Sequence, residues 1–493
     1  MNYIGISTGF HDAAVSVVDN QGNILFAGHS ERYSKNKHDK QLCHDLIEDA
    51  IKHTNDAWEV HYYERPWMKF LRQVRSGESP PLFNLSAKNI IGRQYLKQLD
   101  VSSVTTHNHH LSHAAAGFQT SPFDDATVVV IDAIGEFDTI TIWDAKYVNG
   151  KAKYKKLWAK KYPDSIGLFY SAMTERVGLR PLDEEYILMG MAAYGHATHA
   201  ENMRSVLLDS EEDLDFSQNL HTGVSKDFLK DADEMDIAAS SQKVVELLIA
   251  QVMSKAKKIG KSKNLVYGGG VALNCSANRF LGAFFDNIWI MPNPGDAGNS
   301  LGAAALGYGG RLNWRDSFLG HNIEGAYPVD AVVGRLLSHS IVGVASGRSE
   351  FGPRALGNRS LLADPRGPEI KDKVNEIKRR QKFRPFAPVI LEELADTYFD
   401  MPHGWDNSRY MQVISRCRLP HLFPAIVHAD GTSRVQTVPK DGSGIRKLLE
   451  AWYKETGCPM LLNTSLNIRG EPMVNDRADA DRFEQMYNVK VIS

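Results

Sequence analysis

Four histidines within seven residues are the densest chemical signal in the chain: His107, His109, His110 and His113. His109 and His113 are four residues apart, so on a helix they share one face and can bind one metal ion together. On such a helix His107 and His110 point elsewhere. A histidine-rich surface turn, or buried histidines satisfied by hydrogen bonds, explains an isolated pair of this kind equally well.

Two aspartates favour the metal site over those alternatives. Asp132 ends the β-branched run VVVID, and Asp296 lies in the glycine-containing turn Pro294–Gly298. If both turns face the same cleft as His109 and His113, the four side chains form a site of two imidazoles and two carboxylates. Iron(II), zinc and manganese all accept this donor set. A metal bound there can orient substrate oxygens and polarise a carbonyl group.

Glycine-rich turns are the second chemical signal. A glycine triplet follows the strand 264–267 and precedes a helical pattern, and the stretch 295–302 is also rich in glycine. Glycines at such turns let the backbone approach a nucleotide closely, and a helix N-terminus favours phosphate. Many tight turns contain glycine triplets without binding a nucleotide. The residues predicted to contact a nucleotide are Gly135, Gly268, Gly269, Gly270 and Asn274.

His11 lies in the first glycine-containing turn of the chain. A histidine has the pKa needed to take a proton from a hydroxyl group near neutral pH. We therefore consider His11 a candidate general base. A histidine that only caps the turn is the alternative.

Three polar runs near the C-terminus combine arginine with glycine, proline or asparagine and lack clean helix or strand periodicity. They are Phe351–Ser360, Lys382–Ala387 and Leu462–Glu471. Several convergent arginines indicate an anionic substrate, because the guanidinium group matches phosphate oxygens in a bidentate manner. Arginines that hold loops together through backbone carbonyls are the alternative for any single run.

The elements that must position these residues begin with a repeated design. A strand, a glycine turn, a strand, a turn and another strand occur at 3–27 and again from 128 onward. This pattern predicts a duplicated α/β domain with a cleft between its halves, as in actin-like and sugar-kinase-like ATPases. Other α/β folds begin with similar hairpins. We predict helices around 165–177 and 242–258, a surface segment at 210–236, and a domain boundary near residue 335.

Composition limits the class of protein. With 493 residues the chain is expected to form two domains. Its net charge of −2 produces no global attraction to nucleic acid or to a membrane. The four cysteines include no C-x-x-C pair, and we find neither a signal peptide nor an apolar run long enough to span a bilayer. We therefore expect a cytoplasmic protein that does not associate with membranes.

Nine runs distributed over the chain resemble the nodulation- and antibiotic-type O-carbamoyltransferases. The tail after Glu471 is shorter than is usual in that family. The runs are GFHDAAVSVV, HHLSHAAAGF, ILMGMAAYG, GGGVALNCSAN, PGDAGNSLGAA, EFGPRALGNRSLLADPR, KFRPFAP, DGTSRVQTV and LLNTSLNIRGEP.

The resemblance implies a division of labour between two domains. Residues 1–335 are similar to the actin-like (ASKHA) domain of tRNA threonylcarbamoyl-transfer proteins. Residues 336–493 are similar to an α/β domain that makes carbamoyl adenylates. In this scheme the first domain binds Fe²⁺ or another divalent transition metal, and the second uses ATP, with Mg²⁺, and carbamoyl phosphate. The implied metal ligands are His109, His113, Asp132 and Asp296.

The same resemblance assigns roles around the two substrates. The acceptor hydroxyl attacks the adenylate in the first domain, with His11 as base. The anion ligands in the second domain are Lys382, Arg434 and Arg469, with Arg354, Arg384 and Asn463 nearby. Two other functions remain alternatives. One is a tRNA threonylcarbamoyl-type transferase, and the other is a non-catalytic actin-like nucleotide-binding switch.

The resemblance leaves the acceptor hydroxyl open, and residues 61–98 offer one hint about it. Seven Lys and Arg stand there against two Glu, a balance of +5, with six interleaved aromatic residues. Cations and aromatic rings are what a nucleic-acid groove uses, so a hydroxymethylated base in DNA or a nucleotide is one candidate acceptor. A cap helix with core aromatics and solvated charges is the alternative. A homodimer is also compatible with the sequence.

Overall fold

The computed structural model describes the 493-residue chain except residues 55–56, 382, 385 and 443. The chain forms two compact units. The first unit contains residues 1–34, 38–274 and 281–316, and the second contains 35–37, 275–280 and 317–493. Residue 335, near which the sequence predicts the domain boundary, lies inside helix α13 (Val329–His339) of the second unit.

The first sheet of the first unit is a three-stranded meander extended by two parallel strands. Strands β1, β2 and β3 pair antiparallel, β4 pairs parallel with β1, and β5 pairs parallel with β4. The strand order is β3-β2-β1-β4-β5. The bounds are β1 Asn2–Ser7, β2 Ala14–Val18, β3 Ile24–His29, β4 Trp58–Tyr62 and β5 Thr105–Thr106.

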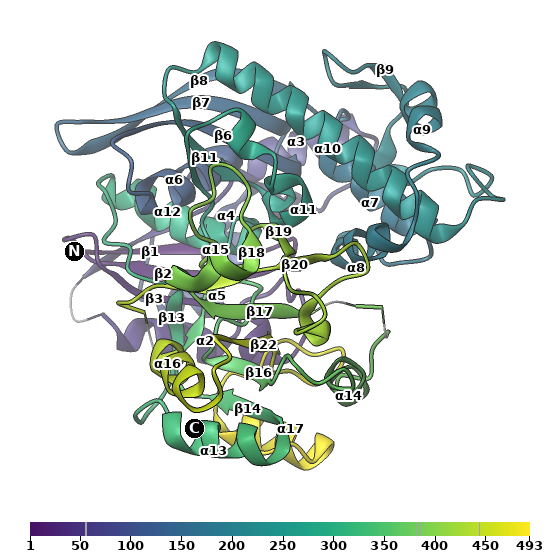
Figure 1. Cartoon of the computed structure of the whole chain (residues 1–493). Coiled ribbons are helices and arrows are strands. Elements are labelled where there is room, and N and C mark those ends of the chain that lie inside the picture. The colour runs from purple at the N-terminus through teal and green to yellow at the C-terminus, as the bar shows by residue number, and fades with distance from the viewer. Residues whose placement is uncertain (55–56, 382, 385, 443) are drawn as a thin grey trace. The chain divides into compact units, whose positions relative to one another are not determined.

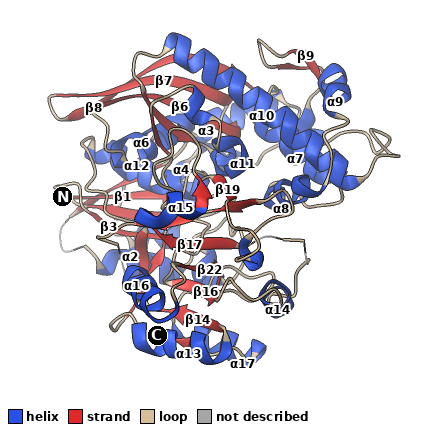
Figure 2. Cartoon of the chain, viewed as in Figure 1, coloured by secondary structure: helices blue, strands red, loops and turns tan. Residues whose placement is uncertain are grey.

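The second sheet of the first unit repeats this topology. Strands β6, β7 and β8 form the antiparallel meander (Figure 2), β11 pairs parallel with β6, and β12 pairs parallel with β11. The order β12-β11-β6-β7-β8 matches that of the first sheet strand for strand. The first unit therefore has the duplicated actin-like fold that the sequence predicts. The bounds are β6 Asp125–Gly135, β7 Asp138–Val148, β8 Lys151–Lys161, β11 Asn264–Gly268 and β12 Asn287–Trp289.

Two helices lie between the sheets and join the halves of the first unit (Figure 1). Helix α6 (His109–Thr120) follows β5 but packs against β6 and β11 of the second sheet. Helix α12 (Asn299–Tyr308) follows β12 but packs against β1 and β2 of the first sheet. The two helices also pack against each other. Each half thus places its last helix on the sheet of the other half.

Glycine sets the distance between these two helices. A Cβ atom at Gly302 of α12 would stand 2.0 Å from the backbone carbonyl oxygen of Ser112 on α6. Only glycine allows this approach without displacing a helix. The contact matters for function because α6 carries the histidine pair and α12 directly follows η6 (Asp296–Gly298), which begins with Asp296.

A longer helix packs against β6 of the second sheet. Helix α10 (Glu234–Ile259) starts at Asp233, whose side chain accepts a hydrogen bond from the Met235 backbone N–H, and it extends the predicted helix by about two turns at its N-terminus. The other helices described in the first unit are α1 Glu31–Ser34, α2 His44–Lys52, α3 Pro66–Arg75, η1 Leu82–Leu85, α4 Ala87–Ile91, α5 Arg93–Gln98, α7 Ile166–Arg176, α8 Glu185–Met191, η2 Ala192–Tyr194, α9 Ala200–Leu207, η3 Leu220–Thr222, η4 Gly270–Leu273, η5 Leu281–Ala283 and η6 Asp296–Gly298.

The second unit is built on a mixed six-stranded sheet with the order β21-β17-β22-β16-β14-β23. Its core contains apolar side chains from the sheet and from helices α13 and α16. The bounds are β14 Ile341–Ala345, β16 Arg359–Ala363, β17 Ala387–Leu391, β20 Thr432–Arg434, β21 Gln436–Val438, β22 Met460–Ser465, β23 Val491–Ile492, α14 Ile370–Ile377, α16 Gly444–Thr456 and α17 Arg477–Tyr487.

Among the described residues, every helix is either too short or too polar to traverse a lipid bilayer.

Candidate metal centre

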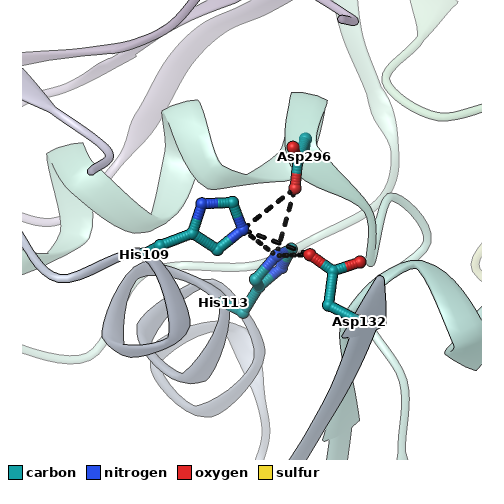
Figure 3. A group of neighbouring side chains, drawn as sticks. All are labelled: His109, His113, Asp132 and Asp296. Carbon is teal, nitrogen blue, oxygen red and sulfur yellow. Dashed lines mark hydrogen bonds and ion pairs between the residues drawn. The ribbon is translucent and has the colours of Figure 1, made fainter. Parts of the chain in front are cut away.

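Three separate elements bring four potential metal ligands together (Figure 3). His109 and His113 lie one turn apart on α6, whose N-terminus is capped by the Asn108 side chain. Asp132 lies on β6 where the register with β7 shifts, so its side chain is free to turn toward the histidines. Asp296 opens η6, at the start of α12. The structure thus brings together all four residues of the predicted ligand set.

The separations of the four facing atoms fit a single cation. His109 Nε2 lies 3.2 Å from His113 Nε2, 3.2 Å from Asp132 Oδ2 and 3.2 Å from Asp296 Oδ1. His113 Nε2 lies 3.5 Å from Asp132 Oδ2 and 3.3 Å from Asp296 Oδ1. Four nitrogen or oxygen ligands at ~2.0–2.1 Å around a tetrahedral ion are separated by about 3.3–3.4 Å. These five separations are therefore close to those of a tetrahedral metal site, and all four atoms lie within 4.8 Å of one another.

The electrostatics of the cluster also favour a cation. All four side chains are buried. Burial alone disfavours the charged forms, yet the carboxylates hold the pKa of both histidines above its usual value. The histidines in turn hold the pKa of Asp132 and Asp296 below its usual range against the effect of burial. Two buried carboxylates facing one point need positive charge there; protonated histidines provide it without a metal, and a divalent ion would provide it when bound.

Neighbouring groups orient the ligands. The Glu64 carboxylate is buried, and its Oε2 atom lies 3.6 Å from His109 Nδ1, just beyond hydrogen-bonding distance. Lys69 Nζ donates to the other oxygen of Glu64 at 2.9 Å. The backbone N–H of Gly270 donates to Asp132 Oδ1 at 3.1 Å. Sequence analysis missed Glu64, although an acidic residue two positions after strand β4 is a recognisable signal.

His11 borders the cluster. Its Nε2 atom lies 3.7 Å from Asp296 Oδ2, and its Nδ1 atom lies 2.9 Å from Asp12 Oδ2. Burial lowers the pKa of His11, but the hydrogen bond to Asp12 and the charges of Asp296 and Asp132 raise it above the usual value. The side chain is 30% exposed, so a substrate can reach it.

The predicted nucleotide residues have packing roles in the first unit. Gly269 has a φ of 87°, and a Cβ atom there would stand 2.2 Å from the Ile131 carbonyl oxygen, so the glycine turn packs tightly on the end of β6. Gly135 packs against the rings of His109 and His110. The Asn274 side chain exchanges hydrogen bonds with Gln242. Gly268 and Gly270 flank Gly269 in the same turn, which is therefore beside the metal cluster.

The predicted anion ligands lie in the second unit. Lys382 is outside the described residues. Arg434 ends β20, and its Nε atom is buried without a hydrogen-bond partner among the described residues. Asn463 on β22 donates to Ala355 O and Gln436 Oε1, and its own Oδ1 is also buried without a described partner. Arg354 and Arg384 are half-buried in loops, and Arg469 is exposed after β22.

Sequence analysis missed a buried lysine in the second unit. Lys378, directly after α14, donates to Ser465 O at 2.6 Å and also contacts Asn467 Oδ1. Burial, together with the charges of Arg380 and Arg384, holds the pKa of its ammonium group well below the usual value. In sequence this residue stands within the charged run KRRQK, which is typical of a solvated surface, so only the tertiary contacts distinguish it.

Some of the basic and aromatic residues of segment 61–98 are used inside the protein. Arg65 pairs with Glu136, Lys69 with Glu64, and Arg72 with Glu78. Tyr62 and Tyr63 are buried in the core. Four cations remain exposed, together with Trp67 and Phe83. The segment therefore offers fewer groups to a nucleic acid than its sequence indicates.

Two family models match the chain. Residues 63–305 match the family described as "Carbamoyltransferase N-terminus", and residues 333–492 match "Carbamoyltransferase C-terminus". The chain is 32% identical to the Synechocystis protein sll1178, over 97% of this chain and 93% of that protein. It is 31% identical to nodulation protein NolNO of Sinorhizobium fredii, over 96% of this chain and 76% of that protein. Nodulation protein U of the same species is 28% identical, over 97% and 96%.

Solved structures resemble part of the chain. Component A of the (R)-2-hydroxyglutaryl-CoA dehydratase of Acidaminococcus fermentans covers 62% of this chain at 16% identity, with 98% of that chain covered and a TM-score of 0.36. HypF of T. kodakarensis covers 62% at 13% identity, with 47% of that chain covered and a TM-score of 0.33.

Proposed function

The chain belongs to the carbamoyltransferase family, and on this premise we propose that it is an ATP-dependent O-carbamoyltransferase with two reaction sites. The first unit transfers the carbamoyl group to a hydroxyl, and the second unit makes carbamoyl adenylate. The observation that carries the proposal is the buried cluster of His109, His113, Asp132 and Asp296, which lies within a chain that matches both halves of the family.

The proposed reaction has three steps. Water cleaves carbamoyl phosphate to carbamate and phosphate. A carbamate oxygen then attacks the α-phosphorus of ATP, and pyrophosphate leaves, which yields carbamoyl adenylate. Finally the acceptor oxygen attacks the carbamoyl carbon, and the acceptor proton goes to a base. The bond between the carbamoyl carbon and the AMP oxygen breaks, and AMP leaves. Adenylation is needed because nitrogen donation makes a free carbamate a poor electrophile.

The second unit has buried polar groups suited to the first two steps. The buried Nε atom of Arg434 supplies a donor for phosphate or carbamate oxygens, whereas Lys378 donates to Ser465 O and holds the end of β22, the strand that carries Asn463. The Asn463 Oδ1 atom, buried without a described partner, supplies an acceptor for the carbamoyl amide. Arg354, Arg384, Arg469 and Lys382 remain proposed anion ligands, and Mg²⁺ is the expected partner of ATP.

The first unit has the groups suited to transfer. His109, His113, Asp132 and Asp296 would hold a divalent transition metal, Fe²⁺ being the one implied by the family resemblance. Such an ion, when bound, polarises a coordinated carbonyl and stabilises negative charge. His11 presents Nε2 to the same site and takes the proton of the acceptor hydroxyl. The glycine turn at Gly268, Gly269 and Gly270, with Gly135 and Asn274, is proposed to contact the nucleotide of the adenylate.

A single assay separates this proposal from its alternatives. The protein is incubated with ATP and Mg²⁺, with and without carbamoyl phosphate, and pyrophosphate is measured. We expect pyrophosphate release that requires carbamoyl phosphate. ATP hydrolysis to ADP that ignores carbamoyl phosphate would instead indicate an actin-like switch.

The acceptor is found by a second assay. Mass spectrometry then detects the mass of one added carbamoyl group on a panel containing glycerol, methyl glucoside, tRNA and DNA with hydroxymethylated bases. A carbamoylated product from tRNA alone would indicate the tRNA-type alternative.

A further inference from the structure

The turn that carries His11 is anchored by a second loop of the first unit. The backbone N–H groups of Gly9 and Ala13 donate to the carbonyl oxygens of Lys40 and Asp39 at 2.8 and 2.7 Å. The Thr8 hydroxyl also donates to the Lys40 carbonyl oxygen, at 2.8 Å. These bonds hold both ends of the turn against residues 38–40.

A continuous chain of side-chain hydrogen bonds leads away from His11 across this junction. His11 Nδ1 lies 2.9 Å from Asp12 Oδ2, and the other oxygen of Asp12 lies 2.7 Å from His38 Nδ1. His38 Nε2 lies 2.9 Å from Asp183 Oδ1, in the loop before α8. Arg180 pairs with the second oxygen of Asp183 at 2.8 Å. This chain of hydrogen bonds therefore runs from His11, beside the metal cluster, to the protein surface.

The chemistry of the partners determines the direction of each bond. An ionised carboxylate only accepts hydrogen bonds, so His11 Nδ1 must donate to Asp12. His38 has carboxylates on both ring nitrogens, so both nitrogens donate and the ring is an imidazolium. Against the effect of burial, the hydrogen bonds to Asp12 and Asp183 raise the pKa of His38 to about 10.

The backbone is strained at the two residues whose side chains join the two loops. Asp12 has a φ of 53° and His38 a φ of 56°, both in the left-handed region. A non-glycine residue in this region costs on the order of 1–3 kcal/mol, and such strain persists where surrounding contacts hold it. Here the side chains of the two strained residues are hydrogen-bonded to each other. The cluster of Asp12, Glu31 and His38 is unsuited to a metal, because both nitrogens of His38 already serve carboxylates.

We infer that Asp12, His38 and Asp183 are positioning residues that hold the His11 imidazole as the Nδ1–H tautomer, with its Nε2 lone pair facing the metal cluster. This inference rests on the proposed role of His11 as the base of the transfer step. A base needs an unprotonated nitrogen aimed at the hydroxyl, and a carboxylate on the opposite ring nitrogen provides it. His38 holds the Asp12 carboxylate in place, and Asp183 in turn holds His38.

The first test reads the orientation of His11 without any reaction. Long-range ¹H–¹⁵N spectra of the full chain with ¹⁵N-labelled histidine are recorded at about pH 9, where imidazole in water is neutral, and His11 is assigned by His11→Asn. We expect the Nδ1–H tautomer in the wild type and the Nε2–H tautomer, which free histidine prefers, in Asp12→Ala. His38→Gln should give a mixture. An Nε2–H tautomer in the wild type overturns the inference.

The second test asks whether the chain acts through His11. Carbamoyl transfer to glycerol, as the probe hydroxyl, is measured for His38→Gln and Asp183→Asn, each alone and combined with His11→Asn. We expect each single variant to lower kcat about 10–100-fold with little change in KM for glycerol, and to have no further effect when His11 is absent. Equal losses in both backgrounds would mean a merely structural role and would overturn the inference.

Controls separate this inference from the proposed function. His44→Gln removes an exposed histidine of α2 and should leave both tests unchanged. Pyrophosphate release that requires carbamoyl phosphate, and the content of bound metal, should persist in every variant of the chain. If the wild type releases no pyrophosphate and carbamoylates nothing, the proposed function fails, and the tautomer spectra alone then decide whether the positioning chain exists.

Discussion

Glu64 offers a quantitative test of the metal centre, because its carboxylate lies beside the ligand His109, just beyond hydrogen-bonding distance, without being a ligand itself. Its buried carboxylate lies 3.6 Å from His109 Nδ1, on the side of the ring opposite the cluster. A carboxylate in this place selects the tautomer that leaves Nε2 for the metal and makes the imidazole a stronger ligand. Glu64→Gln keeps the shape of the side chain and removes its charge.

The expected loss follows from what such neighbours contribute. Removing one lowers metal affinity about 10–100-fold, which corresponds to about 1.4–2.7 kcal/mol. A metal concentration 100 times the wild-type Kd stabilises the wild type by about 2.7 kcal/mol, whereas a variant with 100-fold weaker binding gains only about 0.4 kcal/mol. The metal-induced rise in Tm should therefore nearly disappear.

Two measurements check this prediction. Isothermal titration with Mn²⁺ and Zn²⁺ gives the affinities, and thermal unfolding with and without metal gives the stabilisation. Glu59→Gln is the matched control, because Glu59 lies on β4 five residues earlier and its side chain is 55% exposed. Wild-type affinity in Glu64→Gln, or an equal loss in Glu59→Gln, would refute the role assigned to Glu64.

Three further changes probe the rest of the molecule. Lys378→Met should reduce carbamoyl-phosphate-dependent pyrophosphate release at least about tenfold, because the Ser465 carbonyl oxygen and the Asn467 side chain lose their buried donor. Lys373→Met, which changes an exposed residue of α14, should not reduce it. Gly302→Ala should lower the free energy of unfolding by about 1–3 kcal/mol and weaken metal binding, because α12 must move away from α6. The control Gly334→Ala changes a helical glycine with open space around it and should slightly raise the free energy of unfolding. Denaturant titration measures both changes. Burial, with the charge of Arg32, lowers the pKa of His29 in the folded protein to about 3. The free energy of unfolding that His29 contributes is therefore complete above about pH 6.5, the pKa of an unfolded histidine, and is lost as the pH falls toward 3. The loss due to His29 is at most about 1.36 kcal/mol per pH unit. Unfolding titrations of wild type and His29→Gln should show a shallower loss in the variant, and identical slopes would contradict this.

Local sequence pattern, together with the family resemblance, predicted the duplicated fold. Each half begins with three β-branched strands separated by glycine and asparagine turns, and these short-range signals survive in the structure as β1–β3 and β6–β8. The convergence of the histidine pair with Asp132 and Asp296 was also predictable, because aspartates at strand and turn ends are placed by the topology.

The supporting residues were not predictable in the same way. His38, Asp183 and Lys378 each stand in a polar stretch with no periodicity, and their roles depend on partners far away in the sequence. The cations of segment 61–98 show the same dependence on distant partners, because Glu136, 71 residues from Arg65, neutralises one of them inside the fold.

The division into two reaction sites is tested most directly by Asp296→Ala. With the metal ligand removed, the account predicts that bound metal and carbamoylated product are lost, while pyrophosphate release that requires carbamoyl phosphate persists. In the reciprocal variant, Arg469→Ala, pyrophosphate release should stop with the metal still bound. Loss of pyrophosphate release in Asp296→Ala, or product formation by that variant without metal, would contradict the central claim.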